Sequence, residues 1–390
     1  MQPRTLVLPA ASLLLAGFAH AQYFEARNFA MGGAGVASSH YLAAGWANPA
    51  LLTKCRDTDR FGLILPTVGV LANDKDGLLQ DVEDFVDELD RLEASGSPTQ
   101  GELNALADQL QDLSGRQVTG NANVGFMFAA PSRDLAWAIH AHTFADLQAF
   151  VDVDAADIAA LQGGSIPGTF ASEARVLGVA VTELGFSLAT GFDLGGALLA
   201  IGATPKLQRV DSYNYAVNAD NYDSGDFDND QYRNDDDSFN VDVGASIDPG
   251  LGLTFGAVAR NLVEKDYTTV NTLGQQFLYE INPTASLGAA WSTGLLTLAA
   301  DVDINTKKRF RDTIALTKDD VQLFHLGAEF DLLGWLQLRA GYQNDLENSL
   351  DDTWTAGLGL SPFEVFHIDL AGSYVSDESY GGVIQFALTF

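Results

Sequence analysis

The sequence contains little cysteine, little positive charge and no long apolar segment beyond its N-terminal region. Cys55 is the only cysteine, which excludes an internal disulfide and a cysteine cluster for zinc or iron and sulfur. Basic residues number 21 against 52 acidic ones, so the net charge is −31 and nucleic acid is excluded as a partner of the folded surface. After the first 22 residues no run approaches 18 apolar residues, which excludes a transmembrane helix. Such a chain can span a membrane only as a closed β-barrel, because closure pairs every backbone group.

The first residues have the pattern of a secretory signal. Arg4 precedes a short apolar run, and the run is followed by "AHA" at 19–21, an A-x-A cleavage pattern. We expect residues 1–21 to be a cleaved signal peptide and the mature chain to begin near Gln22. The chain is therefore predicted to leave the cytoplasm.

Segments of about ten residues with alternating polarity recur from residue 61 to the end, and about 14 of them can be counted. In the last one, Ile384, Phe386, Leu388 and Phe390 alternate with small or polar residues. A strand on a soluble core gives the same alternation. Here, however, the second face of the segments is rich in Gly, Ser, Thr and Ala, which suits a packed lumen and favours lipid outside.

The C-terminal residues Phe386, Leu388 and Phe390 form an apolar row that ends the chain. This pattern resembles the signal by which barrel proteins are recognised for assembly. We expect the row to face lipid and to be read by the barrel-assembly machinery.

Long and short connections alternate along the chain. The long first connection, 72–119, is followed by the short turn "APSRD", and the later short turns include "DPGLG", "WSTG" and "DLLG". Outer-membrane barrels have short periplasmic turns and longer external loops, whereas a soluble sandwich has no reason to keep this order. We therefore predict an all-β fold: a transmembrane antiparallel β-barrel of about 14 strands, with an N-terminal hatch in its lumen and a helical external insertion.

The predicted division of the chain follows from these patterns. It comprises a signal peptide at 1–21, a hatch at 22–54 and an outer-membrane barrel at 55–390, with a helical insertion at 72–119 and an acidic external loop at 211–240. In the insertion, apolar residues step by three and four between Leu78 and Leu92, and Thr99 and Glu102 form a capping box for a second helix. We expect a helical hairpin packed over the barrel mouth, or alternatively a lid that grips a ligand.

The acidic loop has spacings that partly match a calcium-binding loop. The acidic residues lie at EF-hand-like offsets, but Gln231 stands where that loop requires glycine. We expect a solvated loop, bridged to lipopolysaccharide phosphates by divalent ions, rather than a dedicated calcium site. The calcium candidates are Asp226, Asp228, Asp230 and Asp237.

The segment before the first strand is rich in small residues, which suit a chain threaded into a narrow lumen. This segment, "ARNFAMGGAGVASSHYLAAGWANPALL", together with "VTELGFSLAT", "AIGATPKLQRVDSYNY" and "LRAGYQNDL", resembles the FadL-like outer-membrane transporters and is most similar to their conjugal transfer TraF-type branch. The resemblance implies a hatch of roughly 23–54 in a 14-stranded barrel and a hydrophobic ligand collected by external loops. The hatch residues it indicates are Gly32, Gly33, Gly35, Asn48 and Pro49.

If the alternation is right, charged residues of both signs face the lumen. Buried charges need partners, so we expect a salt-bridge network that joins hatch and wall, with a polar permeation path as the alternative. His140 and His142 share a strand face, but no carboxylate or cysteine lies at a convincing metal-ligand spacing. The expected network comprises Glu183, Lys206, Arg260, Asp301, Asp303, His325, Glu329, Arg339, His367 and Asp369.

No sequence feature indicates catalysis. The chain has no G-x-S-x-G motif to activate a serine, and we expect neither an enzyme nor a cofactor. The predicted function is passage of hydrophobic small molecules across the outer membrane by a monomeric barrel in contact with lipid and lipopolysaccharide. Two alternatives stay open: a conjugal transfer or cell-surface assembly component without transport, and a polar pore.

Overall fold

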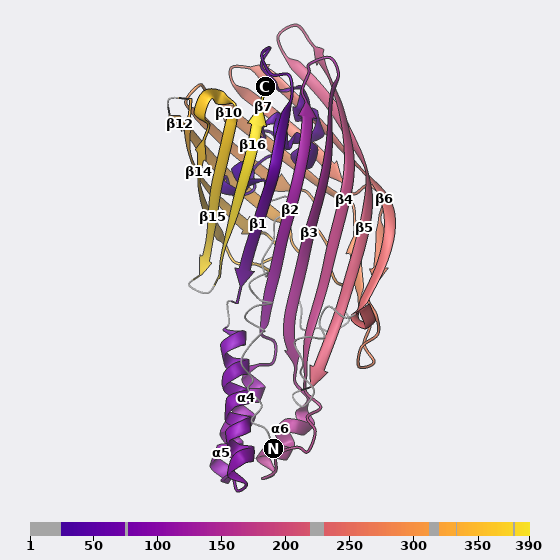
Figure 1. The fold of residues 1–390 in the computed structure, drawn as a ribbon, viewed down its shortest axis with the longest axis vertical. Helices are drawn as coiled ribbons and strands as arrows, with labels where there is room; N and C mark the ends of the chain where they lie inside the picture. Colours follow the sequence, from indigo (N-terminus) through magenta and orange to yellow (C-terminus); the bar gives the residue numbers. More distant parts are fainter. Residues whose placement is uncertain (1–24, 75–76, 219–229, 312–319, 333, 377–378) are drawn as a thin grey trace.

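The chain folds into an antiparallel β-barrel that is closed by pairing of its first and last strands (Figure 1). This computed structural model describes residues 25–74, 77–218, 230–311, 320–332, 334–376 and 379–390. Within them, fourteen strands form the barrel, in the order β1, β16, β15, β14, β13, β12, β11, β10, β7, β6, β5, β4, β3, β2. The predicted fold class is confirmed. No helix in the described ranges is long and apolar enough to cross a membrane.

The barrel strands are β1 Gly62–Asn73, β2 Gln117–Ala130, β3 Ala136–Asp152, β4 Glu173–Asp193, β5 Leu198–Asn218, β6 Arg233–Gly250, β7 Leu253–Arg260, β10 Thr284–Ser292, β11 Leu296–Asp303, β12 Leu323–Leu332, β13 Leu336–Asp345, β14 Thr353–Leu360, β15 Phe366–Ser376 and β16 Ser379–Thr389. A separate two-stranded sheet pairs β8 Lys265–Thr268 with β9 Leu278–Ile281. The strands β3 to β6 are the longest, so one side of the barrel wall is taller than the other (Figure 1).

Each wall strand has an outer apolar face and an inner buried face, as the alternation predicts. On β4, Leu184 and Phe186 are 54% and 40% exposed, whereas Glu183 and Ser187, which flank this pair, are buried. The outer face therefore forms the apolar surface that lipid contacts, and the inner face lines the lumen.

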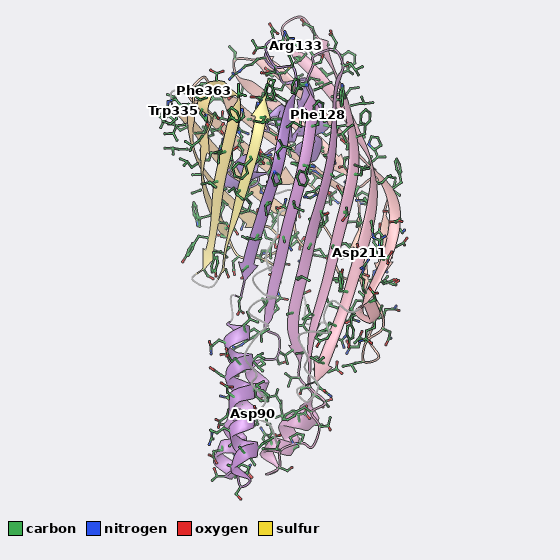
Figure 2. All side chains as sticks on the ribbon, viewed as in Figure 1. Asp90, Phe128, Arg133, Asp211, Trp335 and Phe363 are labelled. Atoms are coloured by element: carbon green, nitrogen blue, oxygen red, sulfur yellow. The ribbon has the colours of Figure 1, made fainter. Side chains whose placement is uncertain are left out.

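The two ends of the barrel differ in their connections. Figure 2 labels Arg133 and Phe363 in short turns at one end and Asp90 on a helix at the other. At the short-turn end, Phe390 stacks on Phe61 with ring centroids 4.8 Å apart, and its backbone N–H donates to the Phe61 carbonyl. Phe386 and Phe390 are both exposed on the outer face of the barrel.

The insertion at the long-loop end forms helices α4 Leu78–Ser95 and α5 Gln100–Asp112. The predicted capping box is present, and its hydrogen bonds from Thr99 lower the pKa of Glu102 to about 2. A third helix, α6 Ala155–Gln162, was not anticipated by the sequence analysis. The three helices share one apolar core with the tips of β2 and β3.

The helical hairpin does not cover the barrel mouth, contrary to expectation. Figure 1 shows α4, α5 and α6 extending past the ends of β2 and β3 along the long axis. The physical reason is that the apolar faces of the helices pack on one another and on the tips of β2 and β3, and so do not pack on the barrel mouth.

The acidic loop at 211–240 is also shorter than predicted. The strand β5 continues to Asn218 and β6 begins at Arg233, so much of this acidic segment is paired strand. Arg209 and Arg233 bind Asp235 and Asp211 across these strands, which offsets repulsion among the carboxylates.

A charge on the lipid face tests this assignment of faces. Ile384 lies in mid-strand opposite Val68 and Leu370, so Ile384→Arg should lower the free energy of unfolding by about 2–4 kcal/mol. Urea titration of the refolded protein in phospholipid vesicles measures this change. Glu93→Arg on the exposed face of α4 is the control, with an expected change of no more than about 0.5 kcal/mol. Equal midpoints for both variants would contradict the assignment.

Candidate functional site

The described part of the predicted hatch, residues 25–54, lies inside the barrel near the short-turn end (Figure 1). It consists of four short helices: α2 Ala26–Ala30, η2 Tyr41–Ala43, α3 Ala44–Ala47 and η3 Pro49–Thr53. The helix α2 stops where Gly32 and Gly33 adopt positive φ angles of 69° and 91°. The hatch therefore turns repeatedly and exposes main-chain groups to the wall.

Close approach of hatch and wall depends on glycine on the wall strands. A Cβ on Gly341 would lie 2.0 Å from the backbone nitrogen of Gly32, and a Cβ on Gly244 would lie 2.0 Å from Oδ1 of Asn48. These separations are far below van der Waals contact, so only glycine lets the hatch dock here. The small residues on the inner face of the wall strands thus allow the hatch backbone to lie against the wall.

Asn48 joins two parts of the hatch to the wall. It is fully buried, and its Nδ2 donates to the carbonyl of Val36 at 2.8 Å and to that of Ala245 on β6 at 3.1 Å. Its Oδ1 accepts the N–H of Ala50, which caps η3, while Pro49 occupies the first turn of that helix. A single amide therefore satisfies three buried main-chain groups.

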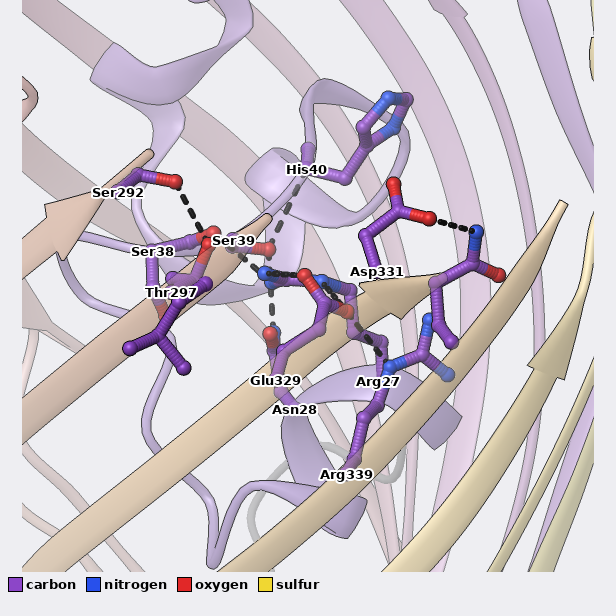
Figure 3. Close-up of polar contacts among 12 residues, drawn as sticks. Arg27, Asn28, Ser38, Ser39, His40, Ser292, Thr297, Glu329, Asp331 and Arg339 are labelled. Carbon is purple, nitrogen blue, oxygen red and sulfur yellow. Dashed lines mark hydrogen bonds and ion pairs between the residues drawn. The ribbon is translucent and has the colours of Figure 1, made fainter. Parts of the chain in front are cut away.

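An ion-pair chain connects the hatch to three wall strands. Glu329 on β12 accepts two hydrogen bonds from Arg27 of the hatch, both at 2.8 Å, and one from Arg339 on β13 at 2.7 Å (Figure 3). Arg339 also donates to Asp369 on β15, and Arg27 donates to the Ser38 carbonyl within the hatch. All the charged groups of this chain are largely buried, so the pairs hold one another in place.

Backbone N–H groups of the hatch bind a second carboxylate. Oδ2 of Asp301 on β11 accepts from Gly35 at 2.6 Å and from Val36 at 2.8 Å. On β14, three strands along the wall, Thr355 accepts from the Gly32 N–H. On the neighbouring strand β12, Nδ1 of His325 donates to the Gly32 carbonyl at 2.6 Å. The Gly32 to Val36 turn is thus held from three strands.

The structure divides the ten predicted lumen residues into groups with different contacts. Those that bind the hatch directly are Arg260, Asp301, His325 and Glu329, with Arg260 donating to the Ala47 carbonyl. Those that extend the ion-pair chain are Arg339 and Asp369. The remaining four bridge wall strands, namely Glu183 and Lys206 with each other, Asp303 with Ser286, and His367 with Ser361 and Thr389.

A separate buried charge cluster lies on the opposite wall. The ammonium of Lys206 on β5 lies 3.2 Å from Glu183 on β4 and 3.0 Å from Asp242 on β6. Gln208 donates to Glu183 at 2.7 Å and to Asn261. The cluster thus contains two carboxylates for one ammonium, an excess of one negative charge.

Two segments from long connections fold inward at the other end of the lumen. We call residues 263–282 and 305–311 the external loop layer. Their Tyr267, Phe277, Tyr279, Ile281 and Phe310 form one buried apolar cluster with the inner faces of β3, β4 and β5. The external half of the lumen therefore contains an apolar cluster, bordered by buried polar and charged side chains.

Polar contacts attach the external loop layer to the wall. Arg309 pairs with Asp146 on β3, and both side chains are buried. Asn214 on β5 donates to the carbonyls of Val270 and Gln275, each at 3.0 Å. Like the hatch, this layer is held by hydrogen bonds and an ion pair.

Several residues of these contacts were missed by the sequence analysis. Arg27, Asp242, Asp146, Arg309 and Asn214 each depend on a partner far away in the sequence, such as Glu329 for Arg27. A signal did exist for Arg27, since it is the only Arg, Lys, Asp or Glu residue in the hatch between Glu25 and Lys54.

Of the metal candidates, the structure describes Asp230, Asp237 and the histidine pair at His140 and His142. No group of three or more His, Cys, Asp or Glu residues with metal-binding geometry occurs in the part of the chain that the structure describes. Asp230 lies in a short helix, η5 Asp230–Tyr232, and Asp237 lies within strand β6 rather than in a loop. Asp226 and Asp228, like the predicted signal peptide, lie outside the described residues.

Solved structures with the same fold are outer-membrane channels. The toluene transporter TodX of P. putida matches with a TM-score of 0.56 and 14% identity, over 95% of this chain and 99% of that one. The toluene transporter TbuX of Ralstonia pickettii matches with 0.55 and 13%, over 95% and 99%. A FadL homologue of Pseudomonas aeruginosa matches with 0.55 and 11%, over 96% and 99%. At these identities the likeness concerns the fold alone, a closed β-barrel of the kind found in that FadL homologue.

A comparison of the sequence with models of protein families identifies the family of this chain. The family described as "F plasmid transfer operon, TraF, protein" matches residues 45–303, more than half of the chain, and the chain belongs to that family. The resemblance proposed from the sequence is confirmed. No curated protein sequence matches the chain significantly.

Removing the shared carboxylate should release the hatch. Glu329→Ala leaves Arg27 and Arg339 buried without it, at a cost of about 3–5 kcal/mol. A cysteine placed by Ala34→Cys, in a Cys55→Ser background, reports release, and its thiol labelling rate should rise roughly 100-fold or more. Glu364→Ala, which removes the exposed pair with Arg56, should leave the rate unchanged. Equal rates for both variants would refute the anchoring role.

A methyl group on the wall tests the close approach independently of charge. Gly341→Ala should push the turn at Gly32 off the wall, at a cost of about 1–3 kcal/mol, and should raise labelling of the same introduced cysteine. Gly382→Ala is the matched control, because its Cβ would have no neighbour closer than 3.5 Å. Similar labelling of the two variants would show that docking tolerates the extra carbon.

Proposed function

We propose that this protein passes small hydrophobic molecules across the outer membrane, with the hatch as its valve. The observation that carries the proposal is the apolar cluster inside the external half of the lumen, where Leu177, Val179 and Val181 of the wall meet aromatic residues of the external loop layer. A polar pore would be lined by hydrated groups, whereas the charged Arg309 and Asp146 beside this cluster are buried and paired with each other. The proposal also draws support from two solved structures of similar fold that are described as toluene transporters.

The contacts of the hatch suit a valve. Its main-chain groups are held by wall side chains such as Asp301 and His325, and these hydrogen bonds can be exchanged for water when the hatch moves. A hydrophobic molecule would enter through the external loop layer and leave past the displaced hatch. We further propose that residues 1–21 are removed as a signal peptide, and that lipopolysaccharide and the barrel-assembly machinery contact the barrel.

A reversible cross-link tests the valve directly. A Cβ on Gly45 in the hatch would lie 2.9 Å from Oγ of Ser187 on β4, so Gly45→Cys with Ser187→Cys can link hatch to wall in a Cys55→Ser background. Uptake of labelled toluene by cells that depend on this barrel should fall at least tenfold when the link is oxidised and recover on reduction.

The matched control links wall to wall through the same position. Ser187→Cys with Thr204→Cys joins β4 to β5, where the two native hydroxyls lie 2.8 Å apart. Oxidation of this pair should leave uptake unchanged. Full toluene uptake with a locked hatch, or no toluene uptake by the reduced and correctly folded protein, would overturn the proposal.

A role in conjugal transfer or surface assembly is the second candidate. The family description and the projecting helices α4, α5 and α6 favour it, since these helices offer an acidic outer surface beyond the barrel. Replacing residues 78–112 by a short linker separates the two roles. Loss of cell contact or mating with toluene uptake intact would assign the helices to assembly.

A further inference from the structure

A row of rings runs along the lumen face of β3 from the hatch toward the external loop layer. The ring centroid of Trp46, in the hatch, lies 5.9 Å from that of His140 and 5.7 Å from that of His142. The His142 ring in turn lies 5.9 Å from Phe144. These spacings are those of rings that pack directly on one another, so the row forms one continuous aromatic surface.

Polar atoms beside this row have no partner. Nε1 of Trp46, Nδ1 of His140 and both amide atoms of Asn123 make no hydrogen bond with the residues that the structure describes. The three side chains are 3%, 2% and 5% exposed. Buried polar groups are almost always paired, so several orphaned atoms in one place indicate a site that receives hydrogen bonds from something bound there.

The strand register places these atoms together. Asn123 on β2 lies opposite Phe144, and Gly125, two residues along the same face, lies opposite His142. A Cβ on Gly125 would lie 3.0 Å from the Trp46 ring and 3.2 Å from that of His142. The orphaned amide, the indole and the imidazole rings therefore lie along one stretch of the inner wall, at the contact between hatch and wall.

The buried charge cluster beside His142 limits which charge the ligand can carry. His142 lies opposite Glu183, whose cluster with Lys206 and Asp242 has two carboxylates for one ammonium. An anionic ligand would meet an excess negative charge, and a plain hydrocarbon would leave the orphaned atoms unpaired. A neutral hydroxyl fits, because it can accept from the indole or amide N–H and donate to the amide oxygen.

We propose that Trp46, Asn123 and His140 form a binding site for a small neutral aromatic molecule that carries a hydroxyl group, of the class of phenol. This inference rests on the proposed function and names the ligand chemistry of that lumen. Because Trp46 belongs to the hatch and the other two residues to the wall, the bound molecule would bridge the valve and its frame.

The affinities of the purified wild-type barrel for phenol, toluene and benzoate test the site. Trp46 is buried, whereas the other four tryptophans are exposed on the outer surface, so a fluorescence change that Trp46→Phe abolishes reports this site. Phenol should bind at least tenfold more tightly than toluene or benzoate, a difference of about 1.4 kcal/mol. Equal affinities, or tighter binding of toluene or benzoate, would overturn the inference.

A substitution of Asn123 tests whether its amide causes the preference for phenol over toluene. Asn123→Leu keeps the volume but removes both amide atoms, so phenol should bind at least tenfold more weakly while toluene binding stays the same or improves. Asn344→Leu, whose amide pairs with Asp352 at the rim, is the control and should keep the preference. A preference for phenol that survives Asn123→Leu would refute the assignment.

The two proposals fail in different ways. Toluene uptake that depends on hatch release, with no phenol preference in the binding assay, would overturn this inference and leave the proposed function standing. Phenol binding at Trp46 with no uptake of any aromatic would support the site and overturn transport. Fluorescence that responds to no ligand would mean that the orphaned atoms are served by water alone, which also overturns the inference.

Discussion

The barrel can hold a folded segment in its lumen only if the main-chain groups of that segment find partners there. An unpaired backbone group away from bulk water costs about 1–3 kcal/mol, and the hatch has many such groups because its helices are short. The wall supplies side chains at the matching positions, such as Asp301 for two adjacent N–H groups. The glycines of the wall follow from the same constraint, because side chains of any size would hold the hatch backbone out of reach of these partners.

The contacts between hatch and wall determine how easily the hatch can be released. Part of the hatch is fixed by apolar packing, because Tyr41, Leu42 and Trp46 belong to one buried cluster with wall residues. Each such side chain contributes about 1.5–3 kcal/mol. The contacts at Glu329, Asn48 and Asp301 are instead hydrogen bonds and ion pairs, whose partners water can replace once the hatch has moved. In the proposed function the hatch and the external loop layer open, while the closed sheet around them stays intact.

The sequence predicted the wall better than the contents of the lumen, for a physical reason. Alternation of apolar and polar residues is a local property, so the strands and the outward position of Phe386 and Phe390 could be read directly from the pattern. The pairing of Arg27 with Glu329 depends on the register of strands 302 residues away. The external loop layer was missed because Tyr267 and Phe310 lie in segments without periodicity, and only the closed barrel brings them together. The orphaned amide of Asn123 could not be predicted at all, since an asparagine on an inner face is normally paired.

The central claim is that the hatch is a unit that opens separately from the barrel. Hydrogen exchange measured on the protein in lipid vesicles tests it most directly, by comparing the amides of Gly35 and Val36 with those in the middle of β12. The account predicts that the hatch amides are protected but exchange at least tenfold faster than the strand amides, and that Glu329→Ala accelerates the hatch alone. Hatch amides that exchange only as slowly as the strands would show that hatch and barrel open as one, and would contradict the account.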